Sequence, residues 1–142
     1  MAIRQLSIFL ENRKGRLETV AKILADNQIN IRGLSVADTA EFGILRLIVE
    51  KVDAAEAVLR NAGVVLHINE VTAVEVDRQP GGLAKVLALL NKADINVEYM
   101  YALAQPESAN PVMILRFDDP KTAREALKNG GCRLLNEADM AI

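Results

Sequence analysis

The sequence is poor in the residues that build metal centres, disulfides and aromatic binding platforms. Its 142 residues include one cysteine, one histidine and no tryptophan, and aromatic residues make up only 4% of the chain. One cysteine cannot close an internal disulfide, and together with one histidine it does not supply the usual ligand set of a zinc site. We therefore expect no metal, no cofactor and a reduced, cytoplasmic protein.

The sequence also lacks a strong excess of charge and a long apolar run. The formal net charge is -2, which gives no electrostatic basis for binding nucleic acid or an anionic membrane surface. No apolar stretch approaches the ~20 residues of a membrane-spanning helix, and the N-terminal apolar run is too short for a signal peptide. With 51% hydrophobic and 25% charged residues, the composition is typical of a globular protein.

What the sequence does contain is an internal repeat. The segment ENRKGRL, residues 11–17, returns as DRQPGGL, residues 77–83, and INI, residues 29–31, returns as INV, residues 95–97. Further along, ILR at 44–46 matches ILR at 114–116, so the offset drifts as loop insertions would make it drift. A period of ~66 residues is longer than most solenoid repeats. It favours one small domain duplicated once, with units at 1–69 and 70–142.

Each unit shows the same succession of periodicities. In the first, residues 4–10 alternate as a strand, Leu17, Val20, Ala21 and Leu24 have helical spacing, and 29–36 and 43–50 are β-rich. A second helix ends at Gly63, and residues 64–68 follow as a closing strand. The second unit repeats the order, starting with a strand over 71–76. The predicted class is therefore α+β: two ferredoxin-like βαββαβ units, each an antiparallel sheet with helices on one face.

These segments resemble the ACT-domain family, in its stand-alone bacterial form of two tandem ACT units. The resemblance covers nearly the whole chain and rests on ENRKGRL, INIRGLSV, FGILRLIV, VEVDRQPGGLAKVLALL and ADINVEYMYA. It implies a non-catalytic, regulatory protein that binds an amino acid or a similar small molecule, with a regulated enzyme of amino-acid metabolism as partner. The family's corner usually reads proline-glycine, as Pro80-Gly81 does, whereas the first unit has Lys14-Gly15, so the two sites need not be equivalent.

Each glycine corner joins a strand to a helix start, where the first N–H groups have no intrahelical partner. Glycine removes the Cβ and permits a tight turn, including one with φ > 0. A ligand carboxylate can accept charge-assisted hydrogen bonds there, worth roughly 1.5–3 kcal/mol each. Its ammonium group would meet an asparagine, Asp77 or strand carbonyls. The candidate ligand-binding residues are Asn12, Arg13, Lys14, Gly15, Arg16, Leu17, Asn30 and Ile31 in the first unit, and Asp77, Gln79, Pro80, Gly81, Gly82, Leu83, Asn96 and Val97 in the second.

Other functions fit the residues less well. Ferredoxin-like sheets can bind RNA by stacking bases on aromatic side chains, but Phe9 has no aromatic counterpart in residues 43–49. The sequence shows no nucleophile–base pair that would indicate an enzyme. A loop that binds phosphate through its backbone would also need more glycine than the one in ENRKGRL. The alternatives that stay open are corners that are tight turns only, and a structural or protein-interaction subunit that has lost ligand binding.

The strand pattern also bears on assembly. If Leu45, Leu47 and Val49 face the helices, the alternate residues form an open, largely apolar face. These outward residues are Ile44, Arg46 and Ile48 in the first unit, and Val112, Ile114 and Arg116 in the second. Apolar open faces favour contact with another sheet or subunit over water. We expect the two units to pack on one another and the chain to form a homodimer, with ligands at the corners and the subunit interface.

Overall fold

A computed structural model describes residues 2–38, 41–106 and 109–142 of the chain. Its contacts divide the chain into two compact units, made chiefly of residues 4–69 and of residues 70–140. The first unit contains β1 (Ile3–Glu11), α1 (Arg16–Asp26), β2 (Ile31–Asp38), β3 (Phe42–Val49), α2 (Val52–Asn61) and the start of β4 (Leu66–Glu75). The second contains the rest of β4, α3 (Gly82–Lys92), β5 (Val97–Ala102), β6 (Val112–Phe117), α4 (Pro120–Asn129) and β7 (Leu134–Leu135). None of the helices in the described residues is long and apolar enough to cross a membrane.

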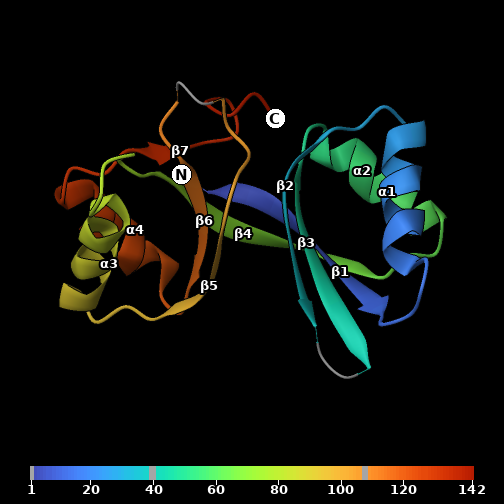
Figure 1. Ribbon diagram of the computed structural model, residues 1–142, viewed down its shortest axis with the longest axis horizontal. Coiled ribbons are helices and arrows are strands. Elements are labelled where there is room, and N and C mark those ends of the chain that lie inside the picture. The colour runs from blue at the N-terminus through green and yellow to red at the C-terminus, as the bar shows by residue number, and fades with distance from the viewer. Residues whose placement is uncertain (1, 39–40, 107–108) are drawn as a thin grey trace. The chain divides into compact units, whose positions relative to one another are not determined.

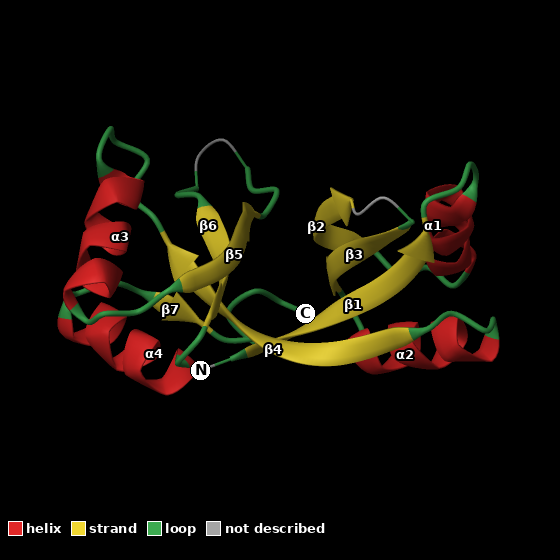
Figure 2. Ribbon diagram, turned by 90° about the horizontal axis from the view of Figure 1, so that it is seen from below, coloured by secondary structure: helices red, strands yellow, loops and turns green. Residues whose placement is uncertain are grey.

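Each unit is an antiparallel sheet with its two helices on one face. The strands follow the order β2-β3-β1-β4 in the first unit, and in the second β4 lies between β6 and β7 with β5 beyond β6. Figure 1 shows α1 and α2 on one side of the first unit's strands and α3 and α4 on one side of the second unit's strands. Figure 2, coloured by secondary structure, shows the same two layers in each unit. The predicted α+β class with two βαββαβ units is confirmed.

The strand β4 departs from the pattern predicted from the sequence. Two strands were expected, over residues 64–68 and 71–76, but a single strand of ten residues runs from Leu66 to Glu75. No glycine or proline stands between these ends, so nothing in the local sequence ends the strand. The last strand of the first unit therefore continues directly as the first strand of the second.

Separate apolar cores lie beneath the helices of the two units. Leu45, Leu47 and Val49 pack in the first core with Val20 and Leu24 of α1. This confirms the predicted inward face of β3. The matching core of the second unit contains Val74, Val76, Val86, Leu90, Leu115, Phe117, Ala123, Leu127 and Leu134.

The apolar stripe of α1 is narrower than its sequence pattern predicts. Val20 and Leu24 are buried, but Leu17 is 49% exposed and Ala21 is also exposed. Leu17 lies in the first turn of α1, and helical side chains lean toward the helix N-terminus. The helix predicted from this spacing is present, but only Val20 and Leu24 of the four residues are buried.

The second helix of each unit ends in the same way, which positions the segment after it. Gly63 has φ of 80°, its N–H donates to the carbonyl of Arg60 at 3.0 Å, and the N–H of Val64 donates to the carbonyl of Leu59 at 3.0 Å. Gly131, with φ of 84°, and Cys132 repeat both features at the end of α4. A left-handed glycine at this position is a common helix terminator. The predicted end at Gly63 is confirmed.

Candidate functional site

The two glycine corners share one backbone conformation. Gly15 and Gly81 are left-handed, with φ of 88° and 95°. The carbonyl of Gly15 accepts a hydrogen bond from the N–H of Thr19 at 3.0 Å, and that of Gly81 accepts one from the N–H of Lys85 at 2.9 Å. Glycine tolerates this conformation because it has no Cβ to meet the backbone. The tight turn with φ > 0 is therefore present at both corners.

The helix starts at these corners have no side-chain cap, unlike the start of α4. No side chain accepts a hydrogen bond from the first turn of α1 or of α3. At α4, Asp119 accepts from the N–H of Thr122 at 3.2 Å. Hydrogen bonds from the side chain and backbone of Thr122 lower the pKa of the Asp119 carboxyl below its usual range. The α4 start thus has a side-chain cap for one of its donors. At the α1 and α3 starts, the N–H of Arg16 donates to the carbonyl of Arg13 at 3.3 Å and the N–H of Gly82 donates to the carbonyl of Gln79 at 3.1 Å. The N–H groups that follow in the first turn of these two helices are left to solvent or a ligand.

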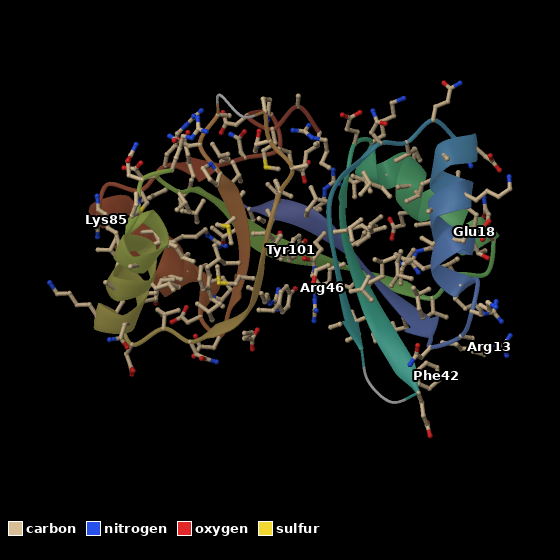
Figure 3. The ribbon with its side chains drawn as sticks, viewed as in Figure 1. Arg13, Glu18, Phe42, Arg46, Lys85 and Tyr101 are labelled. Atoms are coloured by element: carbon tan, nitrogen blue, oxygen red, sulfur yellow. The ribbon has the colours of Figure 1, made fainter. Side chains whose placement is uncertain are left out.

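The side chains of the first corner are longer and more basic than those of the second. Arg13 forms an ion pair with Glu11 at 3.3 Å. Arg16 begins α1 with a half-buried side chain and has no ion-pair partner among the described residues. Figure 3 shows Arg13 and Phe42 at the same end of the first unit. The first corner therefore carries an uncompensated positive charge.

The second corner is held more tightly by its backbone. The carboxylate of Asp77 accepts a hydrogen bond from the N–H of Gln79 at 2.9 Å. A Cβ placed on Gly82 would lie 2.1 Å from the carbonyl oxygen of Asp77, so only glycine fits at this position. Arg16 occupies the matching position in the first unit. The close approach of Gly82 to Asp77 is a feature that the sequence pattern alone did not reveal.

An open pocket of about 580 Å³ lies beside the first corner. It is formed by the end of β1, the first half of α1, the start of β3 and the segment between α2 and β4. Its lining is mostly apolar: Phe9, Leu10, Val20, Ile23, Phe42, Ala62, Gly63, Val64 and Val65, with Glu11, Arg16 and Thr19 as the polar members. Phe9 and Phe42 are 43% and 52% exposed. Large apolar side chains thus remain partly uncovered around this pocket.

A pocket of about 450 Å³ occupies the matching place beside the second corner, but it is polar. It is lined by Glu75, Asp77, Pro80, Gly81, Gly82, Lys85, Val86, Asn110, Gly131, Cys132 and Arg133. Arg133 and Asn110 both contact the carboxylate of Glu75, at 3.4 Å each. Burial raises the pKa of the Cys132 thiol, against a smaller opposite effect of Lys85. Opposite charges therefore lie within one pocket, as a zwitterionic ligand requires.

Smaller pockets adjoin the far side of each corner. One of about 150 Å³ is lined by Leu10, Glu11, Asn12, Arg13, Arg16, Leu17, Val36 and Gly43. Another, of about 240 Å³, is lined by Arg78, Leu103, Gln105, Pro106, Ala109 and Pro111. The structure thus gathers four predicted residues of the first corner, Asn12, Arg13, Arg16 and Leu17, around one space. Lys14 and Gly15 form the exposed turn beside it, and Gln79 and the 39% exposed Leu83 flank the second corner.

Four other predicted residues lie at the opposite ends of the sheets. Glu11 pairs with Phe42 at the start of β3, whereas Ile31 pairs with Val49 at its end. These two positions are the ends of the eight-residue strand β3, and they lie roughly 20 Å apart. Asn30 donates to the carboxylate of Glu50, and its second-unit counterpart Asn96 donates its N–H to Asp118. Within one unit, the glycine corner and the residues at the start of β2 or β5 therefore lie at opposite ends of the sheet.

The sequence did not predict that the α2–β4 and α4–β7 connections form walls of the two pockets. Val64 and Val65 line the first pocket, and Cys132 and Arg133 line the second. The repeat held a signal for them, because VLRNAG at 58–63 matches ALKNGG at 126–131. That match showed a shared helix end but not that the residues after it face the glycine corner.

The comparisons with known proteins agree with this architecture. Over residues 1–142 the chain matches the family described as "ACT domain pair", and it belongs to that family. Among solved structures it is similar to protein BT0572 from Bacteroides thetaiotaomicron, with 37% identity, a TM-score of 0.92, and coverage of 99% of this chain and 96% of that chain. The resemblance to tandem ACT proteins is thereby confirmed.

More distant structures share the fold. The regulatory subunit of aspartate kinase from Thermus thermophilus is 16% identical, with a TM-score of 0.61 and coverage of 89% of this chain and 91% of that chain. The one from Thermus flavus is 13% identical, with a TM-score of 0.58 and coverage of 90% and 92%. A comparison with curated proteins finds no match.

Proposed function

We propose that the chain is a non-catalytic regulatory protein that binds an amino acid, or a similar small molecule, at its glycine corners. The observation that carries the proposal is the recurrence of a left-handed glycine at an uncapped helix start with a pocket beside it. Backbone donors at such a start, together with the helix dipole, favour a carboxylate. Membership in the ACT domain pair family supports the same function.

The second corner has the charges of a complete amino-acid site. The start of α3 and Lys85 would receive the α-carboxylate, because both present positive potential to the pocket. Asp77, also in the lining, would receive the α-ammonium group. At the first corner the proposed ligand residues are Asn12, Arg13, Arg16 and Leu17, which surround the smaller pocket. A regulated enzyme of amino-acid metabolism is the proposed partner.

A melting-temperature screen with the twenty amino acids, followed by calorimetry of each hit, tests the proposal. A ligand at 100 times its dissociation constant stabilises the folded state by ~2.7 kcal/mol. We expect micromolar to millimolar affinity, about -8 to -4 kcal/mol. If none of the twenty shifts the melting temperature or releases heat, the chain is instead a subunit that binds another protein and no amino acid.

A homodimer is proposed from the free edge of the first sheet. β2 lies at the end of the strand order, and its Leu34 and Val36 are 51% and 50% exposed. They stand opposite Leu47 and Leu45, so they extend the helix-facing apolar surface beyond the cover of α1. An edge strand with exposed apolar side chains favours pairing with another strand. Light scattering at micromolar concentration should give twice the chain mass, and Val36→Lys should halve it.

A further inference from the structure

The apolar pocket of the first unit has the character of a small-molecule site. Its volume of about 580 Å³ falls within the roughly 300–1,000 Å³ of such sites, which are mostly apolar with a few polar groups. The whole chain has three phenylalanines, and two of them, Phe9 and Phe42, line this pocket while partly exposed. Val65, in the same lining, is 63% exposed. A ligand with a large apolar body would cover these side chains.

The polar members of the lining favour a negative group on that ligand. Arg16 contributes a guanidinium that has no ion-pair partner among the residues described. Its neighbour Arg13 is already paired with Glu11. A planar guanidinium matches a carboxylate with two parallel hydrogen bonds. Arg16 is therefore the group in this pocket best suited to hold a carboxylate.

The second unit shows that the apolar lining is not a demand of the fold. At the places of Phe9, Thr19 and Val65 the second pocket has Glu75, Lys85 and Arg133. The surrounding backbone shares a left-handed glycine at each corner and another after each second helix. One fold therefore carries an apolar lining in one unit and a charged lining in the other, which points to different ligands.

We propose that the first-unit pocket binds a small carboxylate with a large aromatic or branched apolar body. Arg16 holds the carboxylate, and Phe9, Phe42, Ile23 and Val64 contact the body. The inference goes beyond the proposed function, because the pocket lies between α1 and the α2–β4 segment and the ligand need not carry an ammonium group. An amino acid and its deaminated acid share the required chemistry. Glu11, in the same lining, would favour the amino acid.

Calorimetry of the full chain with L-phenylalanine and with 3-phenylpropionate tests the proposal, because the two probes differ only in the ammonium group. Arg16→Gln should weaken binding by roughly tenfold or more, since it removes a charge-assisted hydrogen bond. Lys22→Gln is the matched control, because Lys22 lies on the same helix, pairs with Asp26 and does not line the pocket. Phe42→Ser should also weaken binding by about tenfold, whereas Phe42→Leu should retain most of it.

The proposal is supported if either probe binds the parent and if Arg16→Gln and Phe42→Ser weaken that binding. The probe that binds more tightly shows whether the pocket prefers the amino acid or the deaminated acid. Absence of heat from both probes, or equal affinity in parent and variants, overturns it. The result is separable from the test of the proposed function. If another amino acid binds and Gly81→Asp abolishes that binding, the proposed function is supported although this pocket is not. Binding of 3-phenylpropionate alone would establish the pocket and leave the amino-acid sensor unsupported.

Discussion

Gly15 and Gly81 adopt nearly the same φ, start helices of eleven residues each and stand beside pockets in matching positions. The side chains around them have diverged: Arg16 against Gly82, Phe9 against Glu75, Val64 against Cys132. The comparison teaches that the fold requires the left-handed corner and the helix that follows it. The fold does not fix the side chains that line the pocket, so the two units have different linings on the same architecture.

The largest expected difference between the corners concerns ligand binding. Gly81→Asp would place a negative side chain where the ligand carboxylate is proposed to bind, and repulsion at about 4 Å amounts to ~4 kcal/mol at an effective dielectric near 20. Gly15→Asp should cost less binding energy, because Arg13, Lys14 and Arg16 compensate the added charge. Calorimetry with the best amino acid from the screen measures both.

Gly81→Ala and Gly15→Ala are the controls for backbone strain in that experiment. Folded Gly81→Asp and Gly15→Asp variants that both bind as tightly as the parent would show that the corners are turns only. The ligand would then have to be sought elsewhere on the chain.

The next largest effect is a difference in stability between variants at Gly82 and at the matching Arg16. Gly82→Ala should lower the free energy of unfolding by about 1–3 kcal/mol, because the added Cβ meets the Asp77 carbonyl at 2.1 Å. Arg16→Ala, at the matching position, meets no such obstacle and should change stability far less. Urea denaturation followed by circular dichroism gives both values. Equal losses would mean that the close approach at Gly82 is absent in solution.

The third prediction is that alanine at either glycine corner lowers the free energy of unfolding by the same amount. Gly15→Ala and Gly81→Ala each add a Cβ to a left-handed residue with open space around it. Each should cost about 1–2 kcal/mol, the usual penalty of this conformation for an L-residue. The same urea titrations measure the pair. Values that differ by more than the experimental error would indicate that the two corners do not share a backbone after all.

The smallest effect distinguishes the capped start of α4 from the uncapped starts of α1 and α3. The pKa of Asp119 is lowered in the folded chain by Thr122. Its contribution to stability is therefore present above the unfolded-state pKa and is lost as the pH falls through the folded-state pKa. Asp119→Asn keeps an accepting oxygen without titrating. The parent's urea midpoint should fall more steeply with acid than the variant's, and parallel curves would contradict the prediction.

Local patterns predicted the parts of this molecule that local physics decides. The helical spacing of Val20 and Leu24, the terminating Gly63 and the repeated corners all follow from residues close in sequence. The distance of Asn30 from the glycine corner could not be predicted. The antiparallel pairing of β2 with β3 places the start of β2 beside Val49, at the end of β3 that lies away from the corner. Val64 and Cys132 were missed as pocket walls for a related reason. They reach the corners through tertiary packing, which spacing along the chain does not encode.

The position of Cys132 has a practical consequence. It is the chain's only cysteine, and it lies in the wall of the second pocket at the place that Val64 takes in the first. Since burial raises its pKa, the thiol is mostly protonated at neutral pH and should be alkylated slowly. A ligand in the second pocket would slow alkylation further, whereas one in the first would leave the rate unchanged. The alkylation rate of the native thiol therefore reports whether the pocket beside the second corner is occupied.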